Sequence, residues 1–568
     1  MWCANCNRTS YSNICEVCGG KTQQDTPIEL FWCDSCHIPV IVEASDTGTH
    51  YCPICGKQIR YLAKDLRPVF PEERLLLEII QNKPFAYKNA SVWASGSRYY
   101  IDGKTSNLSI DLLKKLDANK ISIELDKYRS QNSYDYFNQN IALFVACNKD
   151  RLDAIKQEAE TFVREQVSLF PNHKPVISFS GGKDSTVVAD IVIRALSNPS
   201  IVQIFGDTTL EFPMTYEYVA RHRKQNSLAI IKTAKNKEQD FYSVCDEIGP
   251  PARMMRWCCT MFKTGPITRV LNSVFRDSNI LTFYGIRKHE SVSRSKYDRV
   301  ANVKIQKQTV AAPIFYWTDI EVWLYILGEE IDFNDAYRLG YDRVGCWCCP
   351  NNTLRSQLLA KVYMPEQSTK WRDYLISFAK RIGKPDPEVY VDDGNWKARQ
   401  GGNGLAAAED VKIRYTNCTA EDHAKIYKIN KPVTDEFLNL FVPFGKVSKE
   451  LGRKLLHEAL VLDIHTNVPI LSIQPFAQDG YDYAVKIRTM NVADHEALQR
   501  MAAYQVRKYN ACRKCLKCES VCPFGAITIT QGSYKINEAI CRHCKKCVSA
   551  KYLDGGCLMD RFLKSKED

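Results

Sequence analysis

The chain has 568 residues, 45% of them hydrophobic, with 24 cysteines and a formal net charge of +12, and this length predicts roughly three to five domains. No basic–apolar–small signal follows Met1 and no apolar run reaches the ~18 residues of a membrane span, so we expect a cytoplasmic protein without a membrane partner. In that reducing compartment we expect the cysteines to bind metal rather than to form disulfides.

Four Cys-x2-Cys pairs open the chain. They make two sets of four thiols, each with the spacing of a zinc ribbon, at residues 1–24 and 25–62. The first set is Cys3, Cys6, Cys15 and Cys18, and the second is Cys33, Cys36, Cys52 and Cys55. Zinc is favoured because segments this small cannot fold by burial alone, with iron as the alternative. Four thiolates complete each tetrahedron, so we expect His37 and His50 at the surface.

Residues 63–170 carry no chemical motif. Apolar residues alternate between Ser91 and Ile101, and a charged helical pattern covers Asp150 to Gln166. We therefore expect a small α+β module followed by a lead-in helix.

A phosphate-binding loop is indicated at residues 175–185, Pro-Val-Ile-Ser-Phe-Ser-Gly-Gly-Lys-Asp-Ser. The apolar run 176–179 predicts a buried parallel strand, and an amphipathic helix is expected from Asp184. Glycines between a strand and a helix let backbone N–H groups approach an anion. The loop residues are Ser180, Gly181, Gly182, Lys183, Asp184 and Ser185. The loop lacks the spacer of P-loop NTPases and resembles the pyrophosphate loop of enzymes that split ATP between its α and β phosphates. An ordinary glycine turn is the alternative.

Residues 171–410 contain further segments that are similar to the phosphoadenosine-phosphosulfate (PAPS) reductase family. These are Asp207-Thr-Thr-Leu-Glu-Phe-Pro after a predicted second strand, Arg256-Trp-Cys-Cys-Thr-Met-Phe-Lys263, Tyr284-Gly-Ile-Arg-Lys-His-Glu-Ser291, Pro313 to Trp323, and Asn334 to Cys346. The resemblance implies a doubly wound, parallel-sheet α/β core that binds a nucleotide at the C-terminal ends of its strands.

The same resemblance implies roles for individual residues. Asp207 and Glu211 would lie near the nucleotide or its Mg²⁺. Gly285 belongs to the Gly-Ile-Arg box, and cations would neutralise the anionic end of the ligand. These cations are Lys263, Arg287 and Arg294. The implied catalytic residues are Lys183, Asp184, Lys263 and Arg287. A four-iron cluster would be bound by Cys258, Cys259, Cys346 and Cys349, with Cys348 as a further thiol beside them.

Two departures limit what the resemblance implies. Sulfite-producing members carry a nucleophilic cysteine in a Glu-Cys-Gly-x-His tail, and this chain has no such motif. The reductases usually have a degenerate loop, whereas here the full Ser-Gly-Gly-Lys-Asp-Ser is kept, as in the family's ATP-consuming relatives. The thiols outside every group are Cys147, Cys245, Cys348 and Cys418.

The C-terminal part resembles a bacterial-type ferredoxin with two clusters. Residues 411–505 are expected to form a connecting α+β domain, and residues 506–568 hold two cysteine runs. The runs are Cys512, Cys515, Cys518 and Cys522, then Cys541, Cys544, Cys547 and Cys557. Since the fourth cysteine of each run ligates the other cluster in such ferredoxins, Cys557 joins the first three and Cys522 joins the second run. A short hairpin is expected between the runs, and zinc is the alternative metal.

The basic charge does not by itself predict a nucleic-acid partner. Metal-bound thiolates add negative charge that the formal count omits, and two zinc sites with three oxidised clusters, at about −2 each, would leave roughly +2. A nucleic-acid acceptor stays open but is not indicated.

The sequence supports three hypotheses of function. The first is ATP-dependent sulfur transfer to an unidentified acceptor, with electrons from a donor entering through the ferredoxin segment. The second is reduction of adenylyl sulfate or its 3′-phosphate to sulfite. The third is a protein that senses nucleotide or redox state without catalysis.

Overall fold

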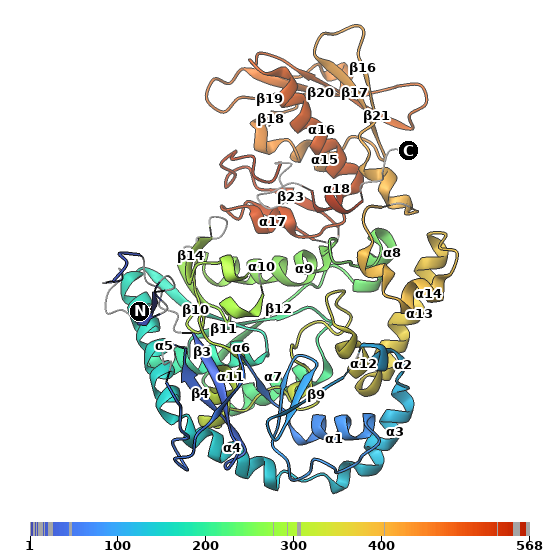
Figure 1. Ribbon diagram of the computed structural model, residues 1–568. Helices are drawn as coiled ribbons and strands as arrows, with labels where there is room; N and C mark the ends of the chain where they lie inside the picture. The colour runs from blue at the N-terminus through green and yellow to red at the C-terminus, as the bar shows by residue number, and fades with distance from the viewer. Residues whose placement is uncertain are drawn as a thin grey trace.

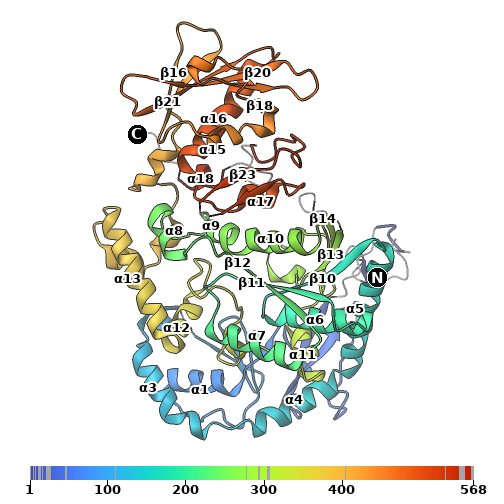
Figure 2. The ribbon, with the colours of Figure 1, turned by 180° about the vertical axis from the view of Figure 1, so that it is seen from behind.

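The computed structural model describes residues 2–3, 6, 8–9, 15, 17–20, 27–44, 48–108, 110–276, 278–291, 294–303, 308–402, 404–530, 532–548 and 557–563. Figure 1 and its reverse view in Figure 2 show a central α/β body, with the N-terminal elements along its lower part and a C-terminal unit seated on its upper part. No helix among these residues combines the length and apolarity of a membrane span.

The N-terminal sheets are small and antiparallel. Their strands are β1 (Trp2–Cys3), β2 (Arg8–Thr9), β3 (Ile28–Cys33), β4 (Ile38–Glu43), β5 (Arg60–Ala63), β6 (Arg67–Pro68), β7 (Val92–Ser95), β8 (Arg98–Ile101) and β9 (Lys104–Asn107). The order is β4-β3-β5 in the second ribbon and β6-β7-β8-β9 in the module that follows. Strand β3 alternates buried and half-buried residues, and Leu30 and Trp32 are fully buried, as expected when one face of a sheet covers a core.

Helices then wrap the lower edge of the molecule (Figure 1). They are α1 (Pro71–Ile80), α2 (Ile110–Lys115), α3 (Ala118–Tyr128), α4 (Asp135–Cys147) and α5 (Lys149–Leu169). The buried residues of α5 include Leu152, Ile155, Ala159 and Phe162, three or four positions apart, so one stripe of the helix faces the body of the protein. This helix covers the charged stretch expected at 150–166.

The central sheet confirms the predicted fold class. Its strands are β10 (His173–Phe179), β11 (Val202–Asp207), β12 (Ile230–Lys235), β13 (Asn279–Phe283), β14 (Val300–Val303) and β15 (Gln308–Ala311), in the order β12-β11-β10-β13-β15-β14. All neighbours are parallel except the edge pair of β14 and β15. The chain runs outward from β10 on one side and returns to its other side with β13, so the strand order reverses at β10. Ligands of open α/β sheets bind at such a point.

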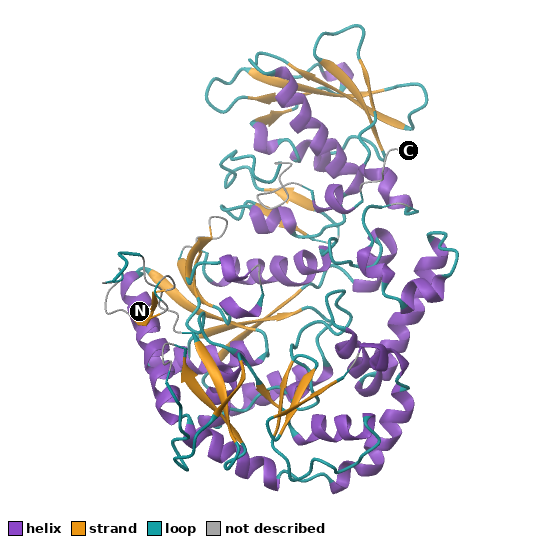
Figure 3. Ribbon diagram, in the orientation of Figure 1, coloured by secondary structure: helices purple, strands orange, loops and turns teal. Residues whose placement is uncertain are grey.

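Helices cover both faces of this sheet (Figure 3). The helices of this part of the chain are α6 (Lys183–Leu196), α7 (Pro213–Gln225), α8 (Phe241–Ile248), α9 (Trp257–Cys259), α10 (Gly265–Val274), α11 (Asp319–Gly328), α12 (Leu354–Tyr363), α13 (Pro365–Arg381) and α14 (Pro387–Asp392), of which α12 to α14 lie at the flank of the body. In both ribbon views α10 lies on the side of the C-terminal unit, and α6 and α11 lie on the opposite side with α5. The sheet is therefore doubly wound.

The C-terminal unit combines a six-stranded antiparallel sheet with the ferredoxin-like segment. Its elements are β16 (Tyr415–Asn417), β17 (Ala424–Ile429), α15 (Asp435–Asn439), β18 (Lys446–Ser448), β19 (Ala459–Leu462), β20 (Pro469–Phe476), β21 (Tyr483–Thr489), α16 (His495–Ala511), α17 (Lys517–Val521), β22 (Ile527–Ile529), β23 (Tyr534–Ile536) and α18 (Leu558–Phe562). The expected hairpin is the antiparallel pair β22–β23.

Two pairs of domains expected from the sequence share an apolar core. They are the connecting domain with the ferredoxin-like segment, and the second ribbon with the central body. The position 505/506 lies within α16, and one apolar cluster holds residues of the sheet and of the cysteine segment, among them Val485 and Ile527. Another cluster runs from Trp32 of the second ribbon to Phe179 of the central sheet. The ribbon and the central body therefore fold around common apolar surface.

Candidate functional site

The loop after β10 holds its own polar side chains in place. The Ser180 N–H donates to Ser185 Oγ (3.1 Å), and Ser185 Oγ donates to the Gly182 carbonyl (2.9 Å). Gly181 adopts a φ of +72°, which only glycine reaches without strain. Within the described residues, no protein acceptor takes the N–H groups of Gly181 and Gly182. These two groups stand at the start of α6, where the helix dipole favours an anion.

Neighbouring elements clamp this loop from outside. Asn334 Nδ2 donates to the Gly181 carbonyl (3.1 Å), and the Lys183 N–H donates to Tyr337 Oη (3.0 Å). A Cβ on Gly285, just after β13, would lie 2.7 Å from the Asp184 carbonyl carbon. Only glycine therefore lets the Gly-Ile-Arg box approach the loop, a physical reason for the residue at this position.

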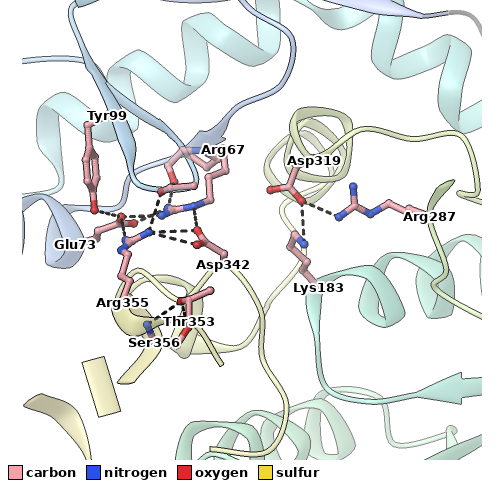
Figure 4. A network of polar contacts seen from close by, with 12 residues as sticks. Arg67, Glu73, Tyr99, Lys183, Arg287, Asp319, Asp342, Thr353, Arg355 and Ser356 are labelled. Carbon is pink, nitrogen blue, oxygen red and sulfur yellow. Dashed lines mark hydrogen bonds and ion pairs between the residues drawn. The ribbon is translucent and has the colours of Figure 1, made fainter. Parts of the chain in front are cut away.

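The charged residues of the loop form a closed network with Arg287 and the start of α11, and Figure 4 shows the part of it around Asp319. Lys183 Nζ lies 3.2 Å from Asp184 and 3.0 Å from Asp319. Arg287 lies 2.6 Å from Asp184 and 2.8 Å from Asp319. Burial is outweighed by Arg287 and Lys183, which lower the pKa of Asp184 to about 2. Lys183 and Arg287, which were expected to contact the anionic ligand, therefore already have carboxylate partners.

A third carboxylate reaches this network from the segment that follows the second ribbon. The Asp65 carboxylate accepts the backbone N–H groups of Asp319 (2.9 Å) and Ile320 (3.0 Å), so it caps α11 from outside the helix. Burial, with the neighbouring Asp319 charge, raises the pKa of Asp65 to about 6. Asp65 thus holds Asp319, and through it the loop cations, in place.

We expect Asp65→Asn to change the pH dependence of nucleotide affinity between about pH 5 and 7. As the pH falls through 6, Asp65 takes up a proton, which leaves Lys183 and Arg287 less neutralised and favours a bound anion. The parent should therefore gain about fivefold more affinity than the variant, the ~1 kcal/mol that one charge exerts over a few ångströms of high dielectric. Isothermal titration at several pH values measures this difference, and the nucleotide's own titration cancels in it. Parallel pH profiles would contradict this role.

The end of β11 carries the second group of expected site residues. Asp207 Oδ1 accepts the Thr209 N–H (2.8 Å) and the Tyr216 hydroxyl (2.8 Å). Glu211 accepts the Thr208 hydroxyl (2.7 Å), and burial raises its pKa. Lys263 is exposed and its charge acts on Glu211. These residues lie at the same C-terminal edge of the sheet as the phosphate loop.

The remaining expected cation, Arg294, stands apart from the closed network. It forms an ion pair with Glu290 one turn earlier in the chain. Burial and the nearby Arg343 lower its pKa. A second guanidinium close by, Arg343, is a residue that the sequence interpretation did not assign to the site.

The core cysteines meet beside Glu211. Cys346 pairs with Glu211 in an isolated β-bridge, and Cys346 Sγ lies 3.5 Å from Thr208 Oγ1. Cys258 and Cys259 form α9, followed by a turn of π-helix at 260–264, a rare element that often occurs at functional sites. The Cys258 thiol and then Arg256, whose Nη2 donates to Cys259 Sγ (3.4 Å), lower the pKa of Cys259 to about 5.

The charges of these cysteines act on one another. The charge of Cys346 raises the pKa of Cys258. Burial raises the pKa of Cys346 to about 12, and the charge of Cys349 adds to that shift. Thiols that raise one another's pKa in a buried space are readily stabilised by a metal that binds thiolates. A four-iron cluster places its cysteines on separate iron atoms, so the sulfurs need not approach as closely as around one ion.

The ribbon cysteines do lie that close. The sulfurs of Cys33, Cys36, Cys52 and Cys55 lie within 4.8 Å of one another, as do those of Cys6, Cys15 and Cys18. The side chain of Cys3 is outside the described part of the chain. Two of the turns are alike, since the Gly19 N–H donates to the Cys15 carbonyl and the Gly56 N–H to the Cys52 carbonyl, both at 2.9 Å. Four thiols around one point fit tetrahedral zinc.

His37 takes the place of glycine in a third turn of this kind. Its φ is +54°, its N–H donates to the Cys33 carbonyl (2.9 Å), and its Nδ1 lies 3.2 Å from Asp102. Near the same ribbon, the buried Cys147 places its Sγ 4.0 Å from Cys52 Sγ, as a fifth thiol.

The ferredoxin-like cysteines fall into two neighbourhoods. Buried Cys515 is affected by the charges of Cys557, Cys518 and Cys512. The charges of Cys522 and Cys544 raise the pKa of Cys541. Those of Cys522 and Cys541, among others, raise the pKa of Cys547. Each neighbourhood contains cysteines that the ferredoxin pattern assigns to one cluster, and the charge of Cys518 in the first also acts on Cys547 in the second.

Two cysteines of the first neighbourhood, Cys515 and Cys557, share an apolar cluster with the core cysteines, whereas Cys512 and Cys518 belong to the cluster of the antiparallel sheet. One apolar cluster contains buried Cys348 and Cys515, and Cys258, Cys346 and Cys557 pack against it. Ion pairs hold the two parts together, because Arg269 on α10 binds Glu519 on α17 at 2.7 Å. Its Nη2 also donates to the Ile529 carbonyl (2.7 Å). The ferredoxin-like segment is therefore docked beside the central cysteines.

A second buried network joins the N-terminal module to the loop that carries Cys346 (Figure 4). Arg67 lies 2.6 Å from Glu73 and 2.5 Å from Asp342, and Arg355 pairs with the same Glu73. The Tyr99 hydroxyl donates to Glu73 (2.9 Å). Since the carboxylate of Glu73 is completely buried, this network fixes the approach of the module to the body.

Sequence interpretation missed several of these residues. Asp319 follows Thr318 in a Thr-x-x-Glu capping box that both partners complete in the structure, and this signal could have marked it. Asn334 and Tyr337 belong to the family-like segment 334–346, although no role was assigned to them, and Asp65 carries no local signal for contact with this site.

Fold and site define a doubly wound α/β domain with an anion-binding loop and a cysteine group at one sheet edge. Residues 174–352 match the phosphoadenosine phosphosulfate reductase domain, and residues 506–528 match the 4Fe-4S binding domain. The chain therefore contains a PAPS reductase domain and a C-terminal 4Fe-4S motif, which confirms the first resemblance and, for the first cysteine run, the resemblance to a ferredoxin.

The relatives cover parts of the chain. It is 32% identical over 274 residues to an uncharacterized protein of Methanocaldococcus jannaschii, covering 48% of this chain and 55% of that protein. It is 26% identical over 204 residues to adenosine 5′-phosphosulfate reductase of Halalkalibacterium halodurans, covering 35% and 80%. The chain thus spans little more than half of the first relative. A solved PAPS reductase of Candida auris superposes with a TM-score of 0.27 at 18% identity, over 35% of this chain and 96% of that one.

Proposed function

We propose that this protein is an iron–sulfur enzyme that binds ATP or an adenylated sulfur compound and couples adenylate chemistry to redox sulfur transfer on an acceptor. One observation carries the proposal: Cys515 and Cys557 of the ferredoxin-like segment share an apolar cluster with Cys258 and Cys346 of the nucleotide domain. Fusion of an electron carrier to its acceptor raises the local donor concentration, and a shared apolar contact shortens the path between them.

The chain's own residues would bind and orient the nucleotide. The N–H groups of Gly181 and Gly182 and the start of α6 would hold phosphate oxygens. Lys183, Asp184, Arg287 and Asp319 would keep this loop rigid, since each cation already faces two carboxylates. Exposed Lys263, between Glu211 and the cysteines, would meet the anionic end of the ligand. Asp207 and Glu211 would be the carboxylates nearest to a magnesium ion.

The cysteine groups would hold two zinc ions and three four-iron clusters. Zinc would be held by the two ribbon sets, one cluster by Cys258, Cys259, Cys346 and Cys349, and two by the C-terminal neighbourhoods. When bound, four-iron clusters supply one-electron transfer. The zinc ions would stabilise the ribbons, because metal binding to such segments is folding free energy.

Anaerobically purified protein is expected to contain about twelve iron and two zinc atoms per chain. Cys258→Ser combined with Cys259→Ser should remove about four iron atoms and keep both zinc ions, because the ribbon sets lie elsewhere. Cys418→Ser, at a thiol outside every group, is the control and should keep all metals. Elemental analysis decides, and loss of zinc with iron unchanged would overturn the assignment of the central cluster.

The reaction is tested by its products. With ATP, an acceptor and a reduced sulfur donor, the proposal expects pyrophosphate when the acceptor is adenylated and AMP when sulfur displaces the adenylate. A second function, reduction of adenylyl sulfate to sulfite and AMP, is favoured by the similarity to adenosine 5′-phosphosulfate reductases. Against it stands the absence of the Glu-Cys-Gly-x-His tail. If the protein forms sulfite from adenylyl sulfate and does not turn over ATP, the second function is correct and the first is wrong. Binding of either nucleotide without turnover would favour a sensor.

A further inference from the structure

Helix α16 carries a lysine into the interior of the C-terminal unit. Lys508 is only 3% exposed, and its Nζ donates to the Cys547 carbonyl (2.8 Å) and lies 5.5 Å from the centre of the Tyr534 ring. No carboxylate of the described residues forms an ion pair with it. A buried ammonium group is costly without a compensating negative charge, so the charge that balances Lys508 must come from another kind of group.

Cysteines of both predicted C-terminal clusters surround this lysine. The thiols whose charges act on it are Cys518, Cys547, Cys557 and Cys512. Three of them belong to the first neighbourhood, and Cys547 belongs to the second. Tyr534 lies at the same place, because its buried hydroxyl meets the Cys518 thiol and, among the described residues, no nitrogen or oxygen atom. Within the described part of the chain, a buried hydroxyl that meets a thiol and an ammonium group without a carboxylate thus lie beside these cysteines, which fits anionic iron–sulfur sites.

Figures 1 and 2 agree on how the lysine reaches this position. In both views α16 lies between the antiparallel sheet and the segment formed by α17, β23 and α18. Val506 and Tyr509, on either side of Lys508 in the helix, are buried in the core that the sheet and the segment share. Residues 411–505 thus support a helix that ends one residue before Cys512.

We propose that Lys508 is the charge-compensating residue of the C-terminal iron–sulfur sites and raises their reduction potentials. This inference rests on the proposed function, in which each site takes up one electron from an external reductant. The added electron makes the site more negative, so a fixed cation stabilises the reduced form more than the oxidised form. Lys508 keeps its proton throughout. The domain at 411–505 then has a role, because it positions this charge.

The test compares four variants as full-length, anaerobically reconstituted protein. Lys508→Gln and Lys508→Met remove the charge, and Lys508→Arg keeps it. Lys486→Met is the control, at a buried lysine of the same domain that pairs with Glu421 instead of cysteines. Iron content is measured first, and reduction is then followed by electron paramagnetic resonance at controlled potential. Signals of the central cluster are identified by their loss in the Cys258→Ser, Cys259→Ser variant.

The neutral variants are expected to be at least about tenfold harder to reduce at the C-terminal sites, ~59 mV for one electron. The arginine and control variants should match the parent. Loss of C-terminal iron in the neutral variants alone would also support the inference, because charge would then be needed to hold the sites. Equal potentials in all proteins with full iron would overturn it, as would iron loss in the arginine variant too. A parent protein without C-terminal iron would instead overturn the proposed function itself.

Discussion

Lys183→Ala or Asp184→Ala is expected to weaken ATP binding at least about a hundredfold, ~2.7 kcal/mol. Lys183→Ala removes a cation from the loop. Asp184→Ala removes the carboxylate that orients Lys183 and Arg287, so the loop loses its shape even though the remaining positive charge would favour an anion. Removing one partner of a buried ion pair destabilises the folded state by ~3–5 kcal/mol. The Asp184 backbone packs so closely on Gly285 that a Cβ on Gly285 would lie 2.7 Å from the Asp184 carbonyl carbon, so the loop has little room to rearrange around a lost charge. Isothermal titration with ATP measures the loss.

Two controls accompany this measurement. The ultraviolet–visible spectrum of the iron–sulfur sites should not change, because the loop and the cysteines lie on separate segments. Lys174→Ala removes an exposed lysine at the opposite end of β10 and should bind ATP like the parent. If Lys183→Ala and Asp184→Ala also bound ATP like the parent, the loop would not be the phosphate site.

Cys541→Ser combined with Cys544→Ser is expected to lower turnover with a physiological electron donor by a factor on the order of 10², because it removes the fused carrier's advantage in local concentration. Nucleotide affinity should stay unchanged, since both cysteines belong to the neighbourhood that does not pack against the core cysteines. Dithionite should restore part of the activity by reaching the central cluster directly. Steady-state rates with the two reductants measure the difference.

Substitution is the better test of electron flow than truncation. A cut after Arg507 would fall inside α16 and open the core that the sheet shares with the cysteine segment. Cys418→Ser provides the matched control for loss of a thiol in the same unit. Unchanged turnover with the physiological donor in the double variant would show that the C-terminal sites are structural or regulatory.

Local patterns predicted the parts of the site that depend on short stretches of chain. The strand expected at 176–179 is β10, and the helix expected from Asp184 begins one residue earlier as α6. The hairpin between the cysteine runs also forms where it was expected. In each case the periodicity of apolar residues and the turn glycines act within about ten residues, so the sequence displays them directly.

Contacts between distant segments could not be predicted in this way. Asp65 meets Asp319 across 254 positions, and Glu73 meets Arg355 across 282. Each of these side chains carries an ordinary charge in an ordinary local pattern, and only the packing of the N-terminal module on the central body makes it buried and paired. In the sequence, Lys508 likewise looks like an ordinary basic residue of an amphipathic helix. Its significance comes from the cysteines that later segments bring to it.

Helix α16 also has a consequence for how this protein could have been assembled from gene fragments. It begins on the antiparallel sheet and ends at Ala511, immediately before the first cysteine of the ferredoxin-like motif. A recombination event at the start of that motif would leave Tyr509 with the sheet and separate it from the residues of the cysteine segment in the same apolar cluster. We therefore expect the sheet and the cysteine segment to be inherited, exchanged or lost as one block, with the tolerated junction ahead of β16 rather than at the first cysteine.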